Sequence, residues 1–455
     1  MTPNIYDILY ATGATLSAPA WLLHPKARRK VFSALQHRMG RVDPRVGAEP
    51  LVLIHAVSLG EINATRKLVE QLAAQRPDLH FVVTSTTDTG FNRGVELYRK
   101  SPRVRVVRFP LDFSSAVRRL LNALRPTLAV LMELEVWPNF TAQCQQRHIP
   151  VLLVNGRLTE GSYRNYLRAG PLTRPMFARL SAVCAQEKTY ADRFIRLGAP
   201  PDRVSITGTM KFDTAQIADR IDGQDELAES LGLYPAAPLW VAGSTGPGEE
   251  AIALDVYRRL LTGHPTLRLA IIPRKPERFN EVAQLIRTAG FELVRRSDVL
   301  AGKASAVSHH SVILGDTMGE LRKFYSLATT VFVGRTLVDL GPKQHGSDMI
   351  EPAGLGKPVV IGQYTTNFTE VMNAFRQANA ISEVATADAL YQCTQDLLAD
   401  PAAAHAMGAR AQAVVREQQG ATTRHVQAIL TFLPPCDGSE HTPAATPQSH
   451  ATFGQ

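Results

Sequence analysis

Carboxylates at the ends of predicted strands are the first candidates for chemistry in this 455-residue sequence. Glu61 opens a predicted helix directly after the apolar strand 51–57 and a short turn. A carboxylate at such a strand–turn–helix tip faces the crevice outside the strand ends, where open α/β sheets bind ligands, and it can act as a general base. The alternative is a first-turn glutamate that only complements the helix dipole.

A second acidic motif, ELEVWPN, occupies residues 133–139 after the predicted strand 127–132. In an extended chain Glu133 and Glu135 project to opposite sides, so we expect one of them to face the ligand crevice. The alternative is a polar loop that a buried Trp137 anchors.

Cations and small hydrogen-bond donors follow several other predicted strands. Lys211 follows a strand end in GTMKFD, and Arg274 follows another in PRKPERF. Ser244 and Thr245 lie in a turn, GST, that suits a neighbouring phosphate. Arg157, in NGRL, is a candidate partner for a carboxylate or phosphate.

The stretch 312–362 is predicted to run strand, glycine-containing turn, helix, strand, long loop, short helix and strand. Thr317, with Glu320 three residues later, has the pattern of a capping box. A helix start at Thr317–Gly319 offers backbone N–H groups and a helix dipole to a phosphate. Glu351, at the start of the next helix, can accept hydrogen bonds from both hydroxyls of a ribose. The alternative is an ordinary βαβ unit with capped helices.

Length and alternating strand and helix patterns predict two α/β domains, each with a parallel, doubly wound sheet. We expect an N-terminal membrane-associated segment at 1–30, a first Rossmann-like domain at 31–215, a second at 216–433 and a disordered tail at 434–455.

The net charge of +9 favours an anionic partner. The basic residues form no platform interleaved with aromatic residues, so nucleic-acid binding is not expected. The apolar segment 8–23 is shorter than the roughly 20 residues of a spanning helix, and a basic stretch at 24–30 follows it. We expect contact with an anionic membrane surface; a short buried helix is the alternative. The His and Cys spacings predict no metal, and we expect no cofactor.

The motifs GDTMGEL at 315–321 and EPAGLGKPVV at 351–360 resemble the C-terminal half of the Kdo (3-deoxy-D-manno-octulosonic acid) transferases of lipopolysaccharide assembly. HAVSLGE, ELEVWPN and NGRL resemble motifs of the same family, and the similarity spans residues 50–430. The resemblance implies a GT-B fold, with two Rossmann-like domains and the active site between them. It also implies CMP-Kdo as donor, a lipid A precursor as acceptor, and a place at the cytoplasmic face of the inner membrane.

The resemblance also implies roles for individual residues. Glu61 matches the catalytic base of a single inverting displacement, Glu133 and Glu135 complete the catalytic set, and Asn139 and Arg157 lie on the acceptor side. The donor-binding set that it implies is Lys211, Ser244, Thr245, Arg274, Thr317, Met318, Gly319, Glu320, Asp348 and Glu351.

The sequence departs from the family pattern just before Glu351. The family usually has a Gly-Gly-His-Asn type sequence there, whereas Ser347 and Asp348 take the places of the His and Asn. Asp348 keeps an acceptor atom, loses the amide donors and adds charge. Two other functions stay open: a GT-B enzyme that uses a UDP-sugar, and a non-catalytic, membrane-peripheral nucleotide-binding protein.

Overall fold

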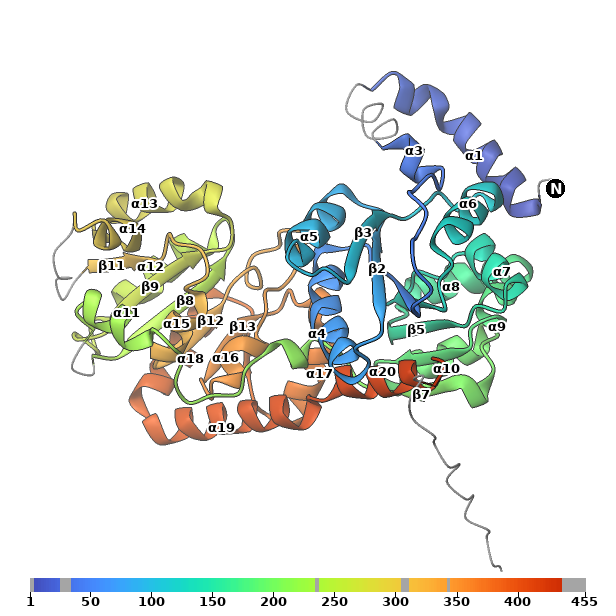
Figure 1. Ribbon diagram of the computed structural model, residues 1–455. Helices are drawn as coiled ribbons and strands as arrows, with labels where there is room; N and C mark the ends of the chain where they lie inside the picture. Colours follow the sequence, from blue (N-terminus) through green and yellow to red (C-terminus); the bar gives the residue numbers. More distant parts are fainter. Residues whose placement is uncertain (1–3, 25–33, 234–236, 304–310, 342–343, 436–455) are drawn as a thin grey trace, which may run out of the picture. The chain divides into compact units, whose positions relative to one another are not determined.

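The chain folds into two compact units in the computed structural model, which describes residues 4–24, 34–233, 237–303, 311–341 and 344–435 (Figure 1). The first unit is Met1–Gly208 together with Thr422–Gln455, and the second is Thr209–Ala421. The C-terminal helix α20 (Ala421–Leu430), which the sequence placed in the second domain, packs in the first unit. There the backbone N–H of Asn155 donates to Nε2 of His425 on this helix (2.8 Å).

The first unit is built on a seven-stranded parallel sheet with the order β3-β2-β1-β4-β5-β6-β7. Every residue of β1 and β4 is buried, because helices cover both faces of the sheet. The strands are β1 (Leu51–His55), β2 (His80–Ser85), β3 (Val104–Arg108), β4 (Leu128–Met132), β5 (Val151–Gly156), β6 (Ala182–Ala185) and β7 (Val204–Ile206).

The described helices of the first unit precede, connect or follow these strands along the chain. Those are α1 (Ile5–Leu22), α3 (Leu35–Arg38), α4 (Leu59–Gln75), α5 (Asp88–Tyr98), α6 (Ser114–Leu124), α7 (Pro138–Gln146), α8 (Glu160–Arg168), α9 (Gly170–Ala178), α10 (Lys188–Arg196) and α20.

The second unit also has a seven-stranded parallel sheet, of order β10-β11-β9-β8-β12-β13-β14, which differs from the first in that β11 lies between β9 and β10. Its apolar core lies on both faces of the sheet: Val241 belongs to one core cluster and its neighbour Trp240 to the other. The strands are β8 (Leu239–Thr245), β9 (Arg268–Pro273), β10 (Glu292–Arg295), β11 (Ser311–Leu314), β12 (Thr330–Val333), β13 (Val359–Gly362) and β14 (Ser382–Val384). The described helices are α11 (Gln224–Ser230), α12 (Glu249–Leu260), α13 (Phe279–Thr288), α14 (Arg296–Leu300), α15 (Leu321–Leu327), α16 (Ile350–Gly354), α17 (Thr369–Gln377), α18 (Ala387–Ala399) and α19 (Pro401–Gln418).

In each sheet the connections from two central neighbouring strands leave in opposite directions. In the first unit β1 pairs with β2 on one side and β4 on the other, and in the second unit β8 pairs with β9 and β12. Open α/β sheets bind ligands outside the carboxyl ends of the strands at such a switch point. The loops that follow β1, β4, β8 and β12 are therefore where functional side chains are expected. The predicted α/β, doubly wound architecture is confirmed in both units.

Helix α1 is fixed at its N-terminal end by polar contacts with the rest of the first unit. Asp7 accepts hydrogen bonds from the backbone N–H (2.8 Å) and hydroxyl (2.6 Å) of Ser114, so it caps α6 from a distant part of the chain. Figure 1 shows this end of α1 beside α6, while the remainder extends away from the sheet. The side chains of Ile8, Leu9 and Leu16 are exposed. None of the helices among the described residues is long and apolar enough to cross a membrane.

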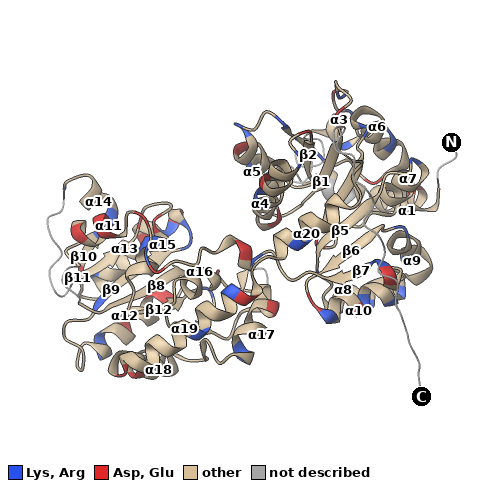
Figure 2. Ribbon diagram, turned by 60° about the horizontal axis from the view of Figure 1, so that its bottom comes forward, with Lys and Arg blue, Asp and Glu red and all other residues tan. Residues whose placement is uncertain are grey.

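The excess of positive charge is distributed over many elements. Figure 2 shows Lys and Arg on helices of both units, among them α6 and α10 of the first and α15 and α19 of the second.

Candidate active site

Glu61 lies at the switch point of the first sheet, in the first turn of α4. Its Oε2 accepts a hydrogen bond from the backbone N–H of Val57 (3.0 Å), and its Oε1 accepts one from that of Ser58 (3.1 Å). The Ser58 hydroxyl accepts in return from the backbone N–H of Glu61 (3.2 Å), which completes a capping box. Glu61 is 9% exposed. It is therefore held in one orientation at a helix start, where the dipole favours a negative charge.

The neighbouring turn after β2 supports the loop that carries Glu61. The hydroxyls of Thr87 (2.6 Å) and Ser85 (3.3 Å) both donate to the carbonyl oxygen of Val57. Gly90 completes this contact, since a Cβ atom at that position would lie 2.5 Å from the same carbonyl oxygen. The peptide group of this carbonyl also carries the Ser58 N–H that Glu61 accepts, so that donor is held in place.

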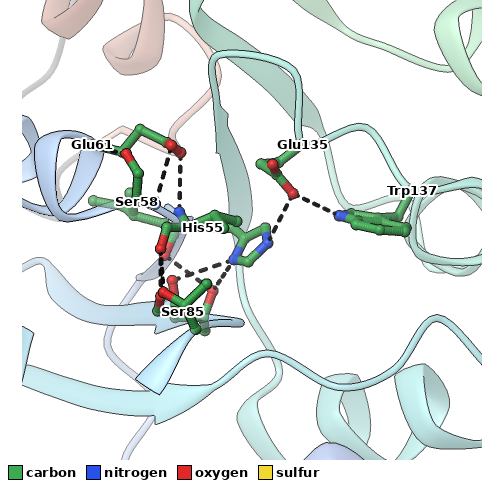
Figure 3. Close-up of polar contacts among 10 residues, drawn as sticks. His55, Ser58, Glu61, Ser85, Glu135 and Trp137 are labelled. Atoms are coloured by element: carbon green, nitrogen blue, oxygen red, sulfur yellow. Dashed lines mark hydrogen bonds and ion pairs between the residues drawn. The ribbon is translucent and has the colours of Figure 1, made fainter. Parts of the chain in front are cut away.

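Glu135 follows β4 on the other side of the switch point. Its Oε2 accepts a hydrogen bond from the indole N–H of Trp137 (3.1 Å) and lies 3.7 Å from Nε2 of His55. Figure 3 shows His55 between Glu61 on one side and Glu135 on the other. His55 is fully buried, stacks on Phe109 with ring centroids 3.7 Å apart, and its Nδ1 lies 3.0 Å from the Thr84 hydroxyl. The two strand-end carboxylates thus flank one buried imidazole.

Glu133 and Glu135 do not alternate along an extended strand, as the sequence analysis assumed. The chain turns directly after β4: Glu133 has a left-handed backbone with φ +52°, and the N–H of Glu135 bonds back to the carbonyl of Met132 (3.1 Å). The carbonyl of Glu133 accepts from the backbone N–H of Arg157 (3.3 Å). Glu133 and Arg157 therefore join the loops after β4 and β5, and Glu135 is the acidic side chain next to His55.

Asn139 is 1% exposed and takes part in the polar contacts that fix the N-terminal end of α1. Its side-chain amide donates to the carbonyl of Asp112 (2.5 Å) and to Oδ1 of Asp7 (3.2 Å), and its oxygen accepts from the amide of Asn4 (2.6 Å). Burial raises the pKa of Asp112, which also accepts from two backbone N–H groups, to about 7. This acceptor-side candidate therefore holds α1 in place, and both N–H donors of its side chain are used within the first unit.

The second switch point carries a buried carboxylate that sequence analysis missed. Glu249 is fully buried in the first turn of α12, and its two oxygens accept from four backbone N–H groups. One donor belongs to the turn after β8, and the other three follow β12; they are Gly246 (2.8 Å), Arg335 (2.5 Å), Thr336 (2.8 Å) and Leu337 (2.9 Å). Glu249 thus fixes both loops of the switch point to each other. An acidic residue four positions after the GST turn was the available signal.

Ser244 and Thr245, the predicted phosphate-adjacent turn, lie at the end of β8 inside this site. Ser244 has a left-handed backbone (φ +55°), and its carbonyl accepts from the hydroxyl of Ser347 (3.2 Å). Thr245 is 1% exposed, and its carbonyl accepts from the backbone N–H of Arg274 (3.0 Å). The loops after β8, β9 and β12 therefore converge.

Two carboxyl groups, Asp348 and Glu351, flank the start of the short helix α16. Asp348 accepts a hydrogen bond from the backbone N–H of Ile350 (2.9 Å), so it keeps the acceptor function expected of this position. Burial raises the pKa of Asp348, and burial together with the negative charge of Asp348 raises the pKa of Glu351 to about 7. Two half-buried carboxyls, of which Asp348 raises the pKa of Glu351, favour a cationic or hydrogen-bond-donating partner.

Cations from three other elements act on this carboxyl pair. Lys211 and Arg274 both favour the ionised form of Asp348, and Arg322 and Arg274 favour that of Glu351. The Lys211 ammonium group donates to the carbonyl of Asn367 (2.9 Å). Nε and Nη2 of Arg322 are buried without a hydrogen-bond partner among the described residues. Arg322 was not predicted as a site residue, because a basic residue in a helix usually lies in solvent.

The predicted helix start at Thr317–Gly319 is wrong. Helix α15 begins at Leu321, and Glu320, the residue before it, makes no capping hydrogen bond. Instead the Thr317 hydroxyl donates to the carboxylate of Glu320, which also forms a bidentate pair with Arg296 (3.0 Å for each bond). This tertiary ion pair outcompetes the local capping box. Met318 is 76% exposed, and Gly319 has φ +86°, so both lie in an open bend before the helix.

Among the described residues, no group of three or more His, Cys, Asp or Glu side chains is placed to hold a metal ion. Two of the histidines considered in the sequence analysis, His309 and His310, lie outside the described residues. The third, His345, contacts Asp339 through Nε2 (2.8 Å) and the Thr366 hydroxyl through Nδ1 (3.1 Å).

Known proteins resemble the chain over most of its length. A family model described as 3-deoxy-D-manno-octulosonic-acid transferase (kdotransferase) matches residues 33–214. The 3-deoxy-D-manno-octulosonic acid transferase of Haemophilus influenzae is 33% identical over 84% of this chain and 87% of that protein. The enzyme of the same name from Bordetella pertussis is also 33% identical, over 87% of this chain and 91% of its own.

Solved structures share the architecture. The UDP-GlcNAc 2-epimerase from Neisseria meningitidis matches 84% of this chain and 100% of its own, with a TM-score of 0.54 and 14% identity. At this identity the likeness concerns the fold alone, and it confirms the predicted GT-B class. The sequence identities go further: at 33% to two such enzymes over more than four fifths of its length, this chain belongs to the family of 3-deoxy-D-manno-octulosonic acid (Kdo) transferases.

Proposed function

We propose that this enzyme transfers Kdo from CMP-Kdo to a lipid A precursor in a single inverting displacement. The observation that carries the proposal is the Glu61 carboxylate, fixed by two backbone N–H groups at the switch point of the first sheet. Membership of the Kdo transferase family supports the transferred sugar, and a fixed carboxylate is the group that a direct displacement needs as a base.

Glu61 acts as the general base in this mechanism. Each of its oxygens accepts one backbone N–H, and a second lone pair on each oxygen remains for the hydroxyl of the acceptor. The acceptor hydroxyl gives its proton to Glu61 while its oxygen forms a bond to the anomeric carbon of Kdo. The bond from that carbon to the phosphate oxygen breaks with its electron pair, and CMP leaves. Glu135, held by Trp137 next to His55, is positioned to orient the acceptor.

The second unit holds the donor. Lys211 and Arg274 supply positive charge for the phosphate, and Glu351 accepts hydrogen bonds from the ribose hydroxyls. The exposed bend of Met318 and Gly319 offers backbone N–H groups to the nucleotide. Arg-to-phosphate hydrogen bonds are among the stronger polar contacts, so Arg274 also stabilises the charge that develops on the departing CMP.

We further propose that α1 lies on the cytoplasmic face of the inner membrane. Polar contacts hold its N-terminal turn to the first unit, while Ile8, Leu9 and Leu16 remain exposed to a partner. An apolar helix followed by the basic sequence at 24–30 suits an anionic lipid surface, since apolar burial and electrostatic attraction then add.

Mass spectrometry of the product tests the proposed reaction. The enzyme is incubated with CMP-Kdo and a tetra-acylated lipid A precursor, and we expect Kdo addition together with release of CMP. Absence of both products with a folded enzyme would support the non-catalytic alternative. Calorimetry with CMP and UDP then tests the donor: we expect the tighter binding for CMP, and a preference for UDP would favour a UDP-sugar enzyme instead.

A further inference from the structure

Arg335 occupies a backbone conformation that side chains rarely adopt. It follows Gly334 directly after β12, and its φ is +60°. Glycine reaches this region freely, whereas a residue with a Cβ atom is strained there. Strained residues cluster at functional sites, where the surrounding structure holds them in place. Here the carboxylate of Glu249 holds the Arg335 backbone N–H (2.5 Å).

The side chain of Arg335 lies over the turn that follows β8. A Cβ atom added to Gly246 would be 3.0 Å from Cγ of Arg335, so the arginine stem passes close to this turn. Because β8 and β12 are the two strands at the switch point of the second sheet, Arg335 stands where open α/β sheets bind their ligands.

The guanidinium group of Arg335 lacks an acidic partner among the described residues. Glu249, the carboxylate that acts on it electrostatically, already accepts four backbone hydrogen bonds. The nearby cation is Arg274: burial and the positive charge of Arg274 both lower the pKa of Arg335. No hydrogen bond or ion pair of the Arg274 side chain is found within the described part of the chain either. Arg274 and Arg335 follow β9 and β12, whose loops both contact the end of β8, and their like charges repel, so an anion bound there would stabilise both.

We infer that Arg335 binds an anionic group of the sugar-nucleotide donor, phosphate or carboxylate, in a paired guanidinium site with Arg274. This rests on the proposed function, because CMP-Kdo carries both groups next to the bond that breaks. The planar guanidinium fork matches either group with two parallel hydrogen bonds. Arg335 is thus a further donor-binding residue of the enzyme.

The substitution Arg335→Gly separates ligand binding from folding. Glycine keeps the backbone N–H that Glu249 binds and removes the strain at φ +60°, so we expect a Tm no lower than that of the wild type. By calorimetry we expect about 10- to 100-fold weaker binding of CMP-Kdo, the range for loss of a charge-assisted hydrogen bond. Cytidine, which lacks an anionic group, should bind with unchanged affinity. Arg335→Asn is a second variant, since Asn tolerates this backbone conformation.

Arg125→Gly is the matched control. Arg125 also has a left-handed backbone (φ +48°), but it is an exposed residue at the end of α6 in the first unit. The same chemical change there should leave the affinities for CMP-Kdo and CMP unchanged.

The ligands distinguish the two anionic groups. Weaker binding of both CMP and CMP-Kdo assigns Arg335 to the phosphate, and weaker binding of CMP-Kdo alone assigns it to the carboxylate. Donor affinity within twofold of the wild type, or an equal loss for cytidine, would overturn the inference and leave the proposed function intact. A wild-type enzyme that does not bind CMP-Kdo would overturn the proposed function and this inference with it.

Discussion

Replacing Glu249 by glutamine should destabilise the second unit more than any surface change can. Glu249 is fully buried and uses Oε1 to accept from Thr336 and Leu337, and Oε2 to accept from Gly246 and Arg335. Glutamine keeps one acceptor oxygen and replaces the other by an NH₂ group. In either orientation of the amide, two backbone N–H groups then face a donor instead of an acceptor.

The size of the effect follows from those two orphaned groups. A buried donor without a partner costs about 1–3 kcal/mol, so two cost about 2–6 kcal/mol. For a domain of this size each kcal/mol lowers the Tm by about 2–4 °C. Differential scanning calorimetry of Glu249→Gln should therefore show an unfolding transition lowered by about 4–24 °C.

The control is Asp255→Asn on the same helix. The Asp255 carboxylate is 59% exposed and lies 3.8 Å from Arg258, so the same loss of charge should change stability by about 0.5 kcal/mol or less. A Tm of Glu249→Gln within the range of this control would refute the idea that one carboxylate ties the loops after β8 and β12 together.

Three further predictions concern pH and the membrane. Burial raises the pKa of Asp112 to about 7, so its stabilising contribution is present below the pKa of the unfolded chain and is lost as the pH rises through about 7. Asp112→Asn should flatten this loss in a series of Tm measurements from about pH 4 to pH 8; an unchanged slope would contradict the assignment. Asp348→Asn should lower the pKa of Glu351, because it removes the negative charge that raises this pKa. It should also strengthen CMP binding several-fold at about pH 8, because one negative charge near the phosphate is removed. Equal or weaker binding by calorimetry would contradict this repulsion. Changing both Leu9 and Leu16 to Ser should reduce the amount of enzyme that floats with anionic vesicles at least tenfold, because each leucine buried in the lipid contributes about 1.5–3 kcal/mol to binding. Equal flotation of the variant and the wild type would show that α1 does not bind the membrane.

The strands were predictable because parallel strands buried on both faces are short, continuous apolar runs. The predicted strands 51–57 and 127–132 are examples: the structure has β1 at Leu51–His55 and β4 at Leu128–Met132. The edge strand β14 was missed, since its sequence Ser-Glu-Val has no such run. No local sequence pattern predicts the order of the strands in the sheet. That order places β1 next to β4, so Glu61 and Glu135 follow neighbouring strands.

Where a prediction from a local sequence pattern was wrong, a contact with a residue distant in sequence explains the difference. The capping box predicted for Thr317 and Glu320 is absent because Arg296, distant in sequence, binds the glutamate. Asn139 follows a motif that points to the acceptor, but Asp7 and Asp112 occupy its amide. A sequence identifies which polar residues follow strands, whereas their partners depend on how distant segments pack.

Turnover of Glu61→Gln tests the role of Glu61 most directly. The variant keeps the shape of the side chain but removes the carboxylate that accepts the proton. Because one backbone N–H that Glu61 binds then faces an NH₂ group, a thermal melt measures whether the first unit stays folded, and CMP binding measures the donor site of the second unit. We predict a fall in kcat of about 10²- to 10⁴-fold with a Kd for CMP within about twofold of the wild type. Wild-type kcat in this variant would contradict the role of Glu61 as the base.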